Sequence, residues 1–166
     1  MVPPMTRALV LALLAATASH AQEGASEITR NPIPGSDFPI AQSVELPAGA
    51  SVLYVSGQVP PVVDESAEQG SRAAYGDTET QTVGVLERID AALENAGYSM
   101  DDVVKMQVFL VGDPEMDGAM DFEGFMAGYT QFFSAERGNL PARSAMEVAG
   151  LVVPGWLVEI EVMAAR

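Results

Sequence analysis

The sequence predicts an α/β (α+β) domain, in which two helices pack on one face of a mixed β-sheet. Short segments with the two-residue periodicity of strands alternate with two segments whose apolar residues recur every three to four positions. The predicted elements follow the order β-β-α-β-α-β-β, and stretches with glycine and proline separate most of them. In this order, the apolar stripe of each helix is buried against the sheet.

The first strong strand prediction covers residues 51–59, which are rich in β-branched and aromatic side chains and end before two prolines. A weaker strand around residues 43–46 precedes it, and residues 47–50 form the turn between the two. Residues 60–76 are acidic and contain two glycines, so we expect a surface loop there.

The first helix is expected to begin at the capping box Thr78–Gln81 and to end at Gly97, which suits a left-handed C-cap. A strand over residues 103–111 follows, with alternate apolar residues on one face. The second helix begins near Asp121 and carries aromatic and apolar residues at helical spacing. Such a stripe is more typical of a core face than of a ligand box. Its members are Phe122, Phe125, Met126, Tyr129, Phe132 and Phe133.

Two closing strands, at residues 142–148 and 157–164, contain charges at alternate positions. Alternation places Arg143, Ala145 and Glu147 on one face of the first strand. It places Glu159 and Glu161 together on one face of the second. We expect Arg143 and Glu159 to lie on neighbouring strands. We expect the helices to cover the apolar face and the charged faces to lie away from them. The charged faces are then either a solvated surface with ion pairs or a cleft between subunits, in which Arg143 would bind a carboxylate through two hydrogen bonds.

The N-terminus has the pattern of a secretory signal peptide over residues 1–21. Arg7 precedes an apolar run at residues 8–16, and residues 19–21 offer small side chains at the cleavage positions. A buried core helix and an uncleaved anchor are the alternatives, although the run is much shorter than the roughly 20 residues that span a bilayer. We expect an exported protein, periplasmic or secreted, with no membrane association after cleavage.

Cleavage after Ala21 would leave a flexible tail at residues 22–37 and one domain at residues 38–166. The only histidine, His20, would be removed, and the chain has no cysteine. A mature chain without either residue excludes a Ser-His-Asp triad, a cysteine nucleophile and the usual zinc sites. The formal charge of −15, made more negative by loss of Arg7, argues against nucleic acid or anionic membrane as a partner.

Several segments together resemble the RidA/YjgF family of reactive-intermediate deaminases, across residues 38–164. The C-terminal signature is carried by residues 140–144, 147–149 and 158–162, which read LPARS, EVA and VEIEV. Residues 54–60, which read YVSGQVP, resemble the N-terminal strand of the family. Residues 96–105 and 129–133 also fit the family pattern.

This resemblance implies a chorismate-mutase-like domain that forms a homotrimer with ligand sites between subunits. It implies hydrolytic deamination of 2-imino or 2-enamine acids to 2-keto acids and ammonia, without a cofactor or metal. Arg143 matches the arginine that binds the substrate carboxylate, and Glu159 matches the glutamate that orients water. The backbone at Ala145 and the strand at Ser56 and Gly57 would line the same pocket.

Three positions differ from the family pattern, one of which is Ala145 in place of a cysteine. Ile40 stands where the family usually has a tyrosine, and Met126 replaces an asparagine, so we expect a more apolar pocket. The alternative function is therefore a trimeric protein that binds small carboxylates without catalysis or behaves as a holdase. Some relatives have been described as ribonucleases, but the acidity and the lack of histidine argue against that activity here.

Overall fold

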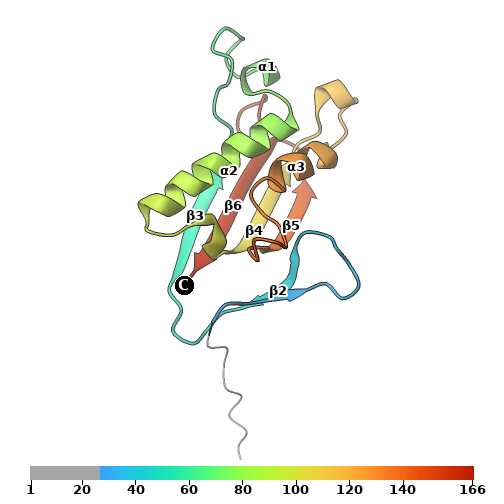
Figure 1. The fold of residues 1–166 in the computed structure, drawn as a ribbon. Helices are drawn as coiled ribbons and strands as arrows, with labels where there is room; N and C mark the ends of the chain where they lie inside the picture. The colour runs from blue at the N-terminus through green and yellow to red at the C-terminus, as the bar shows by residue number, and fades with distance from the viewer. Residues whose placement is uncertain (1–26) are drawn as a thin grey trace, which may run out of the picture.

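The computed structural model describes residues 27–166 as a six-stranded mixed sheet with helices on one face (Figure 1). The predicted signal peptide and the first residues of the predicted tail lie outside the described residues. The strands are β1 (Thr29–Pro32), β2 (Ala41–Glu45), β3 (Val52–Gln58), β4 (Val103–Leu110), β5 (Ala142–Glu147) and β6 (Val158–Ala165). The helices are α1 (Arg72–Tyr75), α2 (Thr78–Asn95) and α3 (Phe122–Tyr129), with short 3₁₀ turns η1 (Met100–Asp102) and η2 (Pro114–Met116).

The strand order is β1-β2-β5-β4-β6-β3, so β4 lies inside the sheet between β5 and β6. β4 pairs with β5 in parallel and with β6 in antiparallel orientation, which makes the sheet mixed, as the sequence predicted. β3 continues the sheet beyond β6, and β1 and β2 form an antiparallel pair at the other end. β2 joins β5 only at the pair Ala41 and Ala142.

Helices α2 and α3 cover one face of the sheet, as predicted, and pack against each other, with α2 over β6 and β3 (Figure 1). Alternate residues of β4 and β6 point into the core beneath the helices. The largest fully buried side chains include Leu86, Ile89, Leu93, Met106, Leu110, Phe125, Tyr129, Phe133 and Ile160. The aromatic stripe of the second helix is thus largely core.

The ends of α2 follow the prediction at one terminus and differ at the other. Gly97 adopts φ of +79°, and the amide of Tyr98 donates to the carbonyl of Leu93, so the predicted left-handed end is confirmed. The N-cap is Asp77 instead of Thr78, because the Asp77 carboxylate accepts from the Thr80 amide at 2.9 Å. Gln81 is buried and bonds the chain near Gly155 and Leu157 instead of closing a capping box.

Three segments differ from the sequence prediction. β1 lies within the expected flexible tail and is fixed by Arg30, whose guanidinium donates to the carbonyls of Val103 and Asp101 at 2.8 and 2.6 Å. The short helix α1 lies within the expected loop at residues 60–76. α3 ends at Tyr129, and Phe133 reaches the core from the turn that follows.

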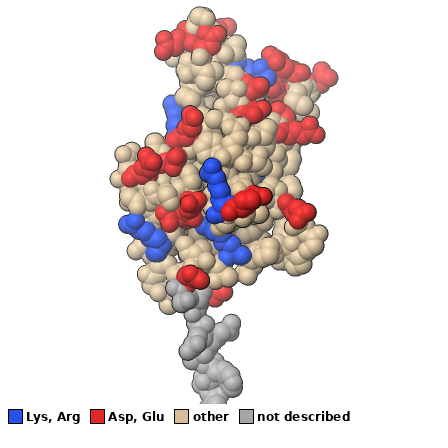
Figure 2. All heavy atoms as spheres, in the orientation of Figure 1, with Lys and Arg blue, Asp and Glu red and all other residues tan. Residues whose placement is uncertain are grey.

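The face shown in Figure 2 carries acidic side chains over many elements, including the loops around α1, with fewer cationic ones. Among residues 27–166, no helix has the length and apolarity needed to cross a membrane.

Candidate functional site

Arg143 lies on the helix-covered side of the sheet, where its guanidinium faces a group of aromatic rings. The expectation that its face of the strand lies away from the helices is therefore wrong. The parallel register pairs Arg143 with Met106, a fully buried residue beneath the helices. The guanidinium carbon Cζ lies 4.3 Å from the centre of the Tyr129 ring and 5.0 Å from that of Phe125. These distances are typical of cation–π contacts, so α3 holds the arginine side chain in place.

Two further rings and a sulfur atom complete the surroundings of Arg143. Phe38 and Phe122 have ring centres 5.5 and 5.9 Å from Cζ, and the two rings stack on each other at 6.5 Å. Met126 lies against the same guanidinium, with its sulfur 3.3 Å from Nη1. We name these four rings and this thioether, from Phe38, Phe122, Phe125, Met126 and Tyr129, the aromatic cluster.

Within residues 27–166, no carboxylate lies within ion-pair distance of Arg143, and the described salt bridges all involve Arg72. Burial lowers the pKa of Arg143, while the neighbouring Tyr129 favours the charged form. An arginine keeps its charge at neutral pH even so. A half-buried cation without a carboxylate partner is a favourable place for a bound anion.

Tyr129 keeps its own proton beside this cation. Burial raises the pKa of Tyr129 to about 12, and its hydroxyl donates to the carbonyl of Pro39 at 2.9 Å. The phenol is therefore a neutral group at physiological pH, and its donor is already used. Tyr129 offers an aromatic face to Arg143 instead of a negative charge.

The outer edge of β5 is open beside Arg143. Beyond the pair Ala41–Ala142, the described structure shows no strand paired with that edge from Arg143 to Glu147. Ala145 follows Arg143 on the same face and is exposed. An open strand edge presents backbone N–H and C=O groups, so polar backbone atoms and a cation are available within one short stretch.

Glu159, Ser56 and Gly57 gather on the opposite, uncovered face of the sheet. Glu159 pairs with Phe109 of β4, whose side chain alternates with the buried Val108. The Glu159 side chain crosses Gly57, since a Cβ atom at residue 57 would overlap its carboxylate. Gly57 belongs to the bulged part of β3, so the absence of a side chain there makes room for the glutamate.

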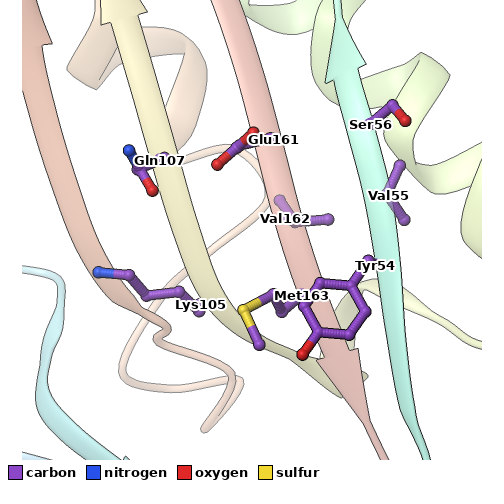
Figure 3. A pocket seen from close by; sticks show the side chains of 8 residues that line it. All are labelled: Tyr54, Val55, Ser56, Lys105, Gln107, Glu161, Val162 and Met163. Carbon is purple, nitrogen blue, oxygen red and sulfur yellow. The ribbon is translucent and has the colours of Figure 1, made fainter.

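A shallow pocket of about 360 Å³ opens on the same face (Figure 3). Polar side chains reach it from three strands: Ser56 from β3, Lys105 and Gln107 from β4, and Glu161 from β6. Tyr54 borders the pocket and is 73% exposed, which is unusual for so large a ring. This uncovered face therefore combines polar groups with accessible apolar surface.

One chain does not bring Arg143 and Glu159 together, and the expectation that their strands are neighbours is wrong. β4 lies between β5 and β6, and the two side chains point to opposite faces of the sheet. The physical reason is register: β5 pairs Arg143 with the inward-facing Met106, whereas β6 pairs Glu159 with the outward-facing Phe109. The predicted residues form two separate groups, Arg143 with Ala145 and Glu159 with Ser56 and Gly57.

Sequence reasoning missed Phe38 as a neighbour of Arg143 and assigned Phe122 only to the core. The available signal was the position of Phe38, two residues before Ile40 in the segment matched to the family's tyrosine. Met126 was predicted to alter the pocket, and it does contact Arg143. Ile40 lines a neighbouring groove of about 580 Å³. No group of three or more potential metal-ligating side chains occurs within the described part of the chain.

The architecture is that of the chorismate-mutase-like α+β proteins of the YjgF group. Comparison with solved structures supports this fold assignment. A crystal structure of Escherichia coli TdcF with bound serine matches 86% of this chain and 99% of TdcF, with 32% identity and a TM-score of 0.54. A Rid-family protein of unknown function from Yersinia pestis matches 82% of this chain and 96% of its own, with 27% identity and a TM-score of 0.59.

The family model described as endoribonuclease L-PSP matches residues 39–166. The chain therefore belongs to the RidA/YjgF family, to which that model corresponds. TdcF of E. coli K12, which is named as a reactive intermediate deaminase, is 33% identical over 80% of this chain and 91% of its own length. A RutC family protein of Saccharolobus solfataricus is 37% identical over 77% of this chain and 87% of its own.

Proposed function

We propose that the protein hydrolyses reactive 2-imino acids, and the 2-enamine acids that interconvert with them, to 2-keto acids and ammonia. The observation that carries this proposal is the half-buried Arg143, which has no carboxylate partner within residues 27–166 and lies beside the open edge of β5. Its guanidinium suits a substrate carboxylate. Similarity to a protein named as a reactive intermediate deaminase, and to a structure with bound serine, supports the same assignment.

The complete site in this proposal lies between two copies of the chain. Arg143 and Glu159 occupy opposite faces of one sheet, so a pocket containing both needs the uncovered face of a second copy. The exposed Tyr54 and the polar pocket beside it support the use of that face as an interface. A homotrimer, as the family resemblance implies, would contain three such sites.

The proposed reaction needs no covalent enzyme intermediate. Water attacks the electrophilic imine carbon, so a carbon–oxygen bond forms and the carbon–nitrogen double bond becomes single. The nitrogen then takes up protons and leaves as ammonia, while the oxygen loses its proton and becomes the keto group. Arg143 fixes the substrate carboxylate, and Glu159 accepts a hydrogen bond from the attacking water and orients it.

A coupled assay tests the reaction directly. An L-amino-acid oxidase generates the imine, semicarbazide traps what remains, and a deaminase lowers the semicarbazone signal. We expect activity in the wild type and its loss in Arg143→Ala, because removing a charged partner of a bound carboxylate costs about 2–5 kcal/mol, or about 30-fold or more. Arg137→Ala is the control, since the Arg137 side chain is exposed and, within residues 27–166, donates only to the Phe132 carbonyl. Equal rates in wild type and Arg143→Ala would refute the role of Arg143.

A second candidate is a protein that binds small carboxylates without turning them over, or that acts as a holdase. The contact between Met126 and Arg143 favours binding alone, because a thioether gives poor hydrogen-bonding support to a polar transition state. Calorimetric titration with 2-keto acids, combined with the coupled assay, separates the two functions. Binding that needs Arg143 without any turnover would favour this second candidate.

Ribonuclease activity, which the description of the family model names, is a weaker candidate. The formal charge of −15 disfavours a polyanionic substrate. RNA cleavage by the purified protein that is abolished in Arg143→Ala would overturn this conclusion. Cleavage that persists in the variant would instead indicate a contaminating nuclease.

We also propose export, with cleavage of the signal peptide after Ala21. The support is the sequence pattern of residues 1–21. Intact-mass measurement of the protein recovered from its native host should give a chain beginning at Gln22. A chain that retains residues 1–21 in the cytoplasm would refute export.

A further inference from the structure

We propose that the Arg143 site selects 2-imino acids with a bulky apolar side chain, such as those derived from phenylalanine, leucine or methionine, over three-carbon substrates. This inference rests on the proposed function, since it names the substrate class of the same site. The aromatic cluster provides the selectivity, and Phe38 is its main determinant.

The walls around Arg143 are apolar apart from the arginine itself. Four ring centres lie within 6 Å of the guanidinium carbon, and Met126 fills a further side. The one hydroxyl in the cluster, on Tyr129, already donates to the Pro39 carbonyl. The copy of the chain that supplies Arg143 therefore offers a ligand one cation for its carboxylate and aromatic or thioether surface for its substituent.

The aromatic cluster disfavours polar substituents, because it lacks free hydrogen-bonding groups, and favours apolar substituents, because it offers apolar contact. A polar substituent would give up its hydrogen bonds to water when it enters this site. The aromatic cluster has no free side-chain partner to replace those hydrogen bonds. An apolar substituent loses nothing and gains contact with the rings. Methionine sulfur adapts to different shapes, so Met126 suits branched as well as planar substituents.

Phe38 is the part of the cluster with surface still available. Its side chain is 41% exposed, whereas Phe125 and Tyr129 are fully buried. Its stacked partner Phe122, with the two rings only 14° from parallel, keeps it beside Arg143. An exposed aromatic face next to an unpaired cation is the arrangement that a carboxylate with an apolar tail would cover.

Space for a large substituent continues past Phe38. The same ring forms one wall of the groove of about 580 Å³ between the β1–β2 pair and the segment after α3. Ile33, Pro39, Ile40 and Leu140 supply further apolar walls of that groove. Polar residues, among them Asp37 and Glu136, line the rest of the groove, so an apolar substituent that passes the Phe38 ring is expected to lie against the apolar walls.

Turnover measurements test the selectivity. With imines generated from alanine, leucine, methionine and phenylalanine, we expect kcat/KM at least about tenfold higher for the bulky substrates, the usual scale for filling an apolar pocket. Phe38→Ala should reduce that preference about fivefold or more, because kcat/KM should fall more for the bulky substrates than for the alanine-derived imine. A structural role of Phe38 would lower all rates together. Phe38→Leu should retain the preference for the leucine-derived imine and lose part of that for the phenylalanine-derived one.

Calorimetry separates failure of this inference from failure of the proposed function. Phenylpyruvate should bind at least about tenfold more tightly than pyruvate, and Phe38→Ala should remove most of the difference. Val152→Ala, a truncation of a side chain that is 88% exposed, is the control and should change neither affinity. Equal affinities for the two keto acids overturn the inference. Selective binding without turnover of any imine overturns the deaminase proposal and supports the selectivity.

Discussion

Arg143 and Glu159 point to opposite faces of the same sheet, with strand β4 between their strands. No rotation of either side chain brings them together through a closed sheet. If both serve one reaction, each site must take its arginine from one copy and its glutamate from another. The geometry within one chain thus makes assembly a condition of the proposed activity.

Mixing two inactive variants tests this sharing of residues. In a trimer refolded from equal amounts of Arg143→Ala and Glu159→Gln, random assembly gives about a quarter of the sites an intact arginine and an intact glutamate. We expect about a quarter of wild-type activity in the coupled assay, with either variant alone inactive. A mixture of Arg143→Ala with the double variant Arg143→Ala/Glu159→Gln is the control. It should be inactive, because neither chain carries Arg143. If the single-variant mixture also stays inactive, the two residues do not share a site across copies.

Gly57 controls the position of Glu159. A methyl group at residue 57 would overlap the Glu159 carboxylate, which lies at the end of a flexible chain and can move away. Gly57→Ala should therefore remove most deamination activity with little change in the free energy of unfolding. Gly150→Ala is the matched control, because nothing lies within 4 Å of a Cβ atom there. Full activity in Gly57→Ala would show that the observed position of Glu159 is not needed.

The fold could be predicted because the apolar periodicity that indicates each strand and helix lies within that element's own residues. Strands and helices of the core carry regular apolar periodicity, and their residue ranges agree closely with the structure. β1 carries no such signal, since it is short, largely exposed and held by Arg30 through distant carbonyls. The side-chain pattern of β5 was predicted, but which face meets the helices depends on its register with β4, a contact between residues about 37 positions apart.

The ion pair between Arg72 and Asp113 connects helix α1, in the region where a surface loop was predicted, with the segment between β4 and α3. Arg72 donates two hydrogen bonds to the Asp113 carboxylate, at 2.7 and 2.8 Å, and Asp113 is almost fully buried. Burial alone would raise the pKa of Asp113, but the bonds from Arg72 and from the Glu115 amide outweigh it and hold that pKa below its ordinary value of 3.8.

The pH dependence of stability should follow from this pair. Because the Asp113 pKa is depressed in the folded state, its stabilisation is present above pH 3.8 and is lost as the pH falls through the lower folded-state value. At neutral pH, Arg72→Met should lower the free energy of unfolding by about 1–3 kcal/mol, since a buried carboxylate loses its partner. In denaturant titrations, that difference should shrink below pH 3.8. A difference that is independent of pH would mean that packing of Arg72, and not its charge, stabilises the loops.

Gly128 sets the distance between α2 and α3 and, through α3, the placement of the rings against Arg143. A Cβ atom at residue 128 would lie 2.8 Å from atoms of Thr82 and 3.1 Å from the Glu79 carbonyl oxygen. Thr82 is buried and its hydroxyl donates to the Thr78 carbonyl at 2.7 Å, so it cannot easily move. Gly128→Ala gains helix propensity but overpacks this contact, and we expect a net loss of about 1–2 kcal/mol in the free energy of unfolding.

The matched test of that contact is a double-variant cycle with Thr82→Ser, which removes one methyl group and keeps the hydroxyl. Gly128→Ala/Thr82→Ser should be more stable than the sum of the two single changes predicts, because the crowded methyl is gone. The same cycle should partly recover keto-acid affinity, since α3 carries Phe122, Phe125 and Tyr129 to Arg143. Strict additivity in denaturant titrations would show that Gly128→Ala acts elsewhere, and unchanged stability would show that the helices accommodate the methyl without moving.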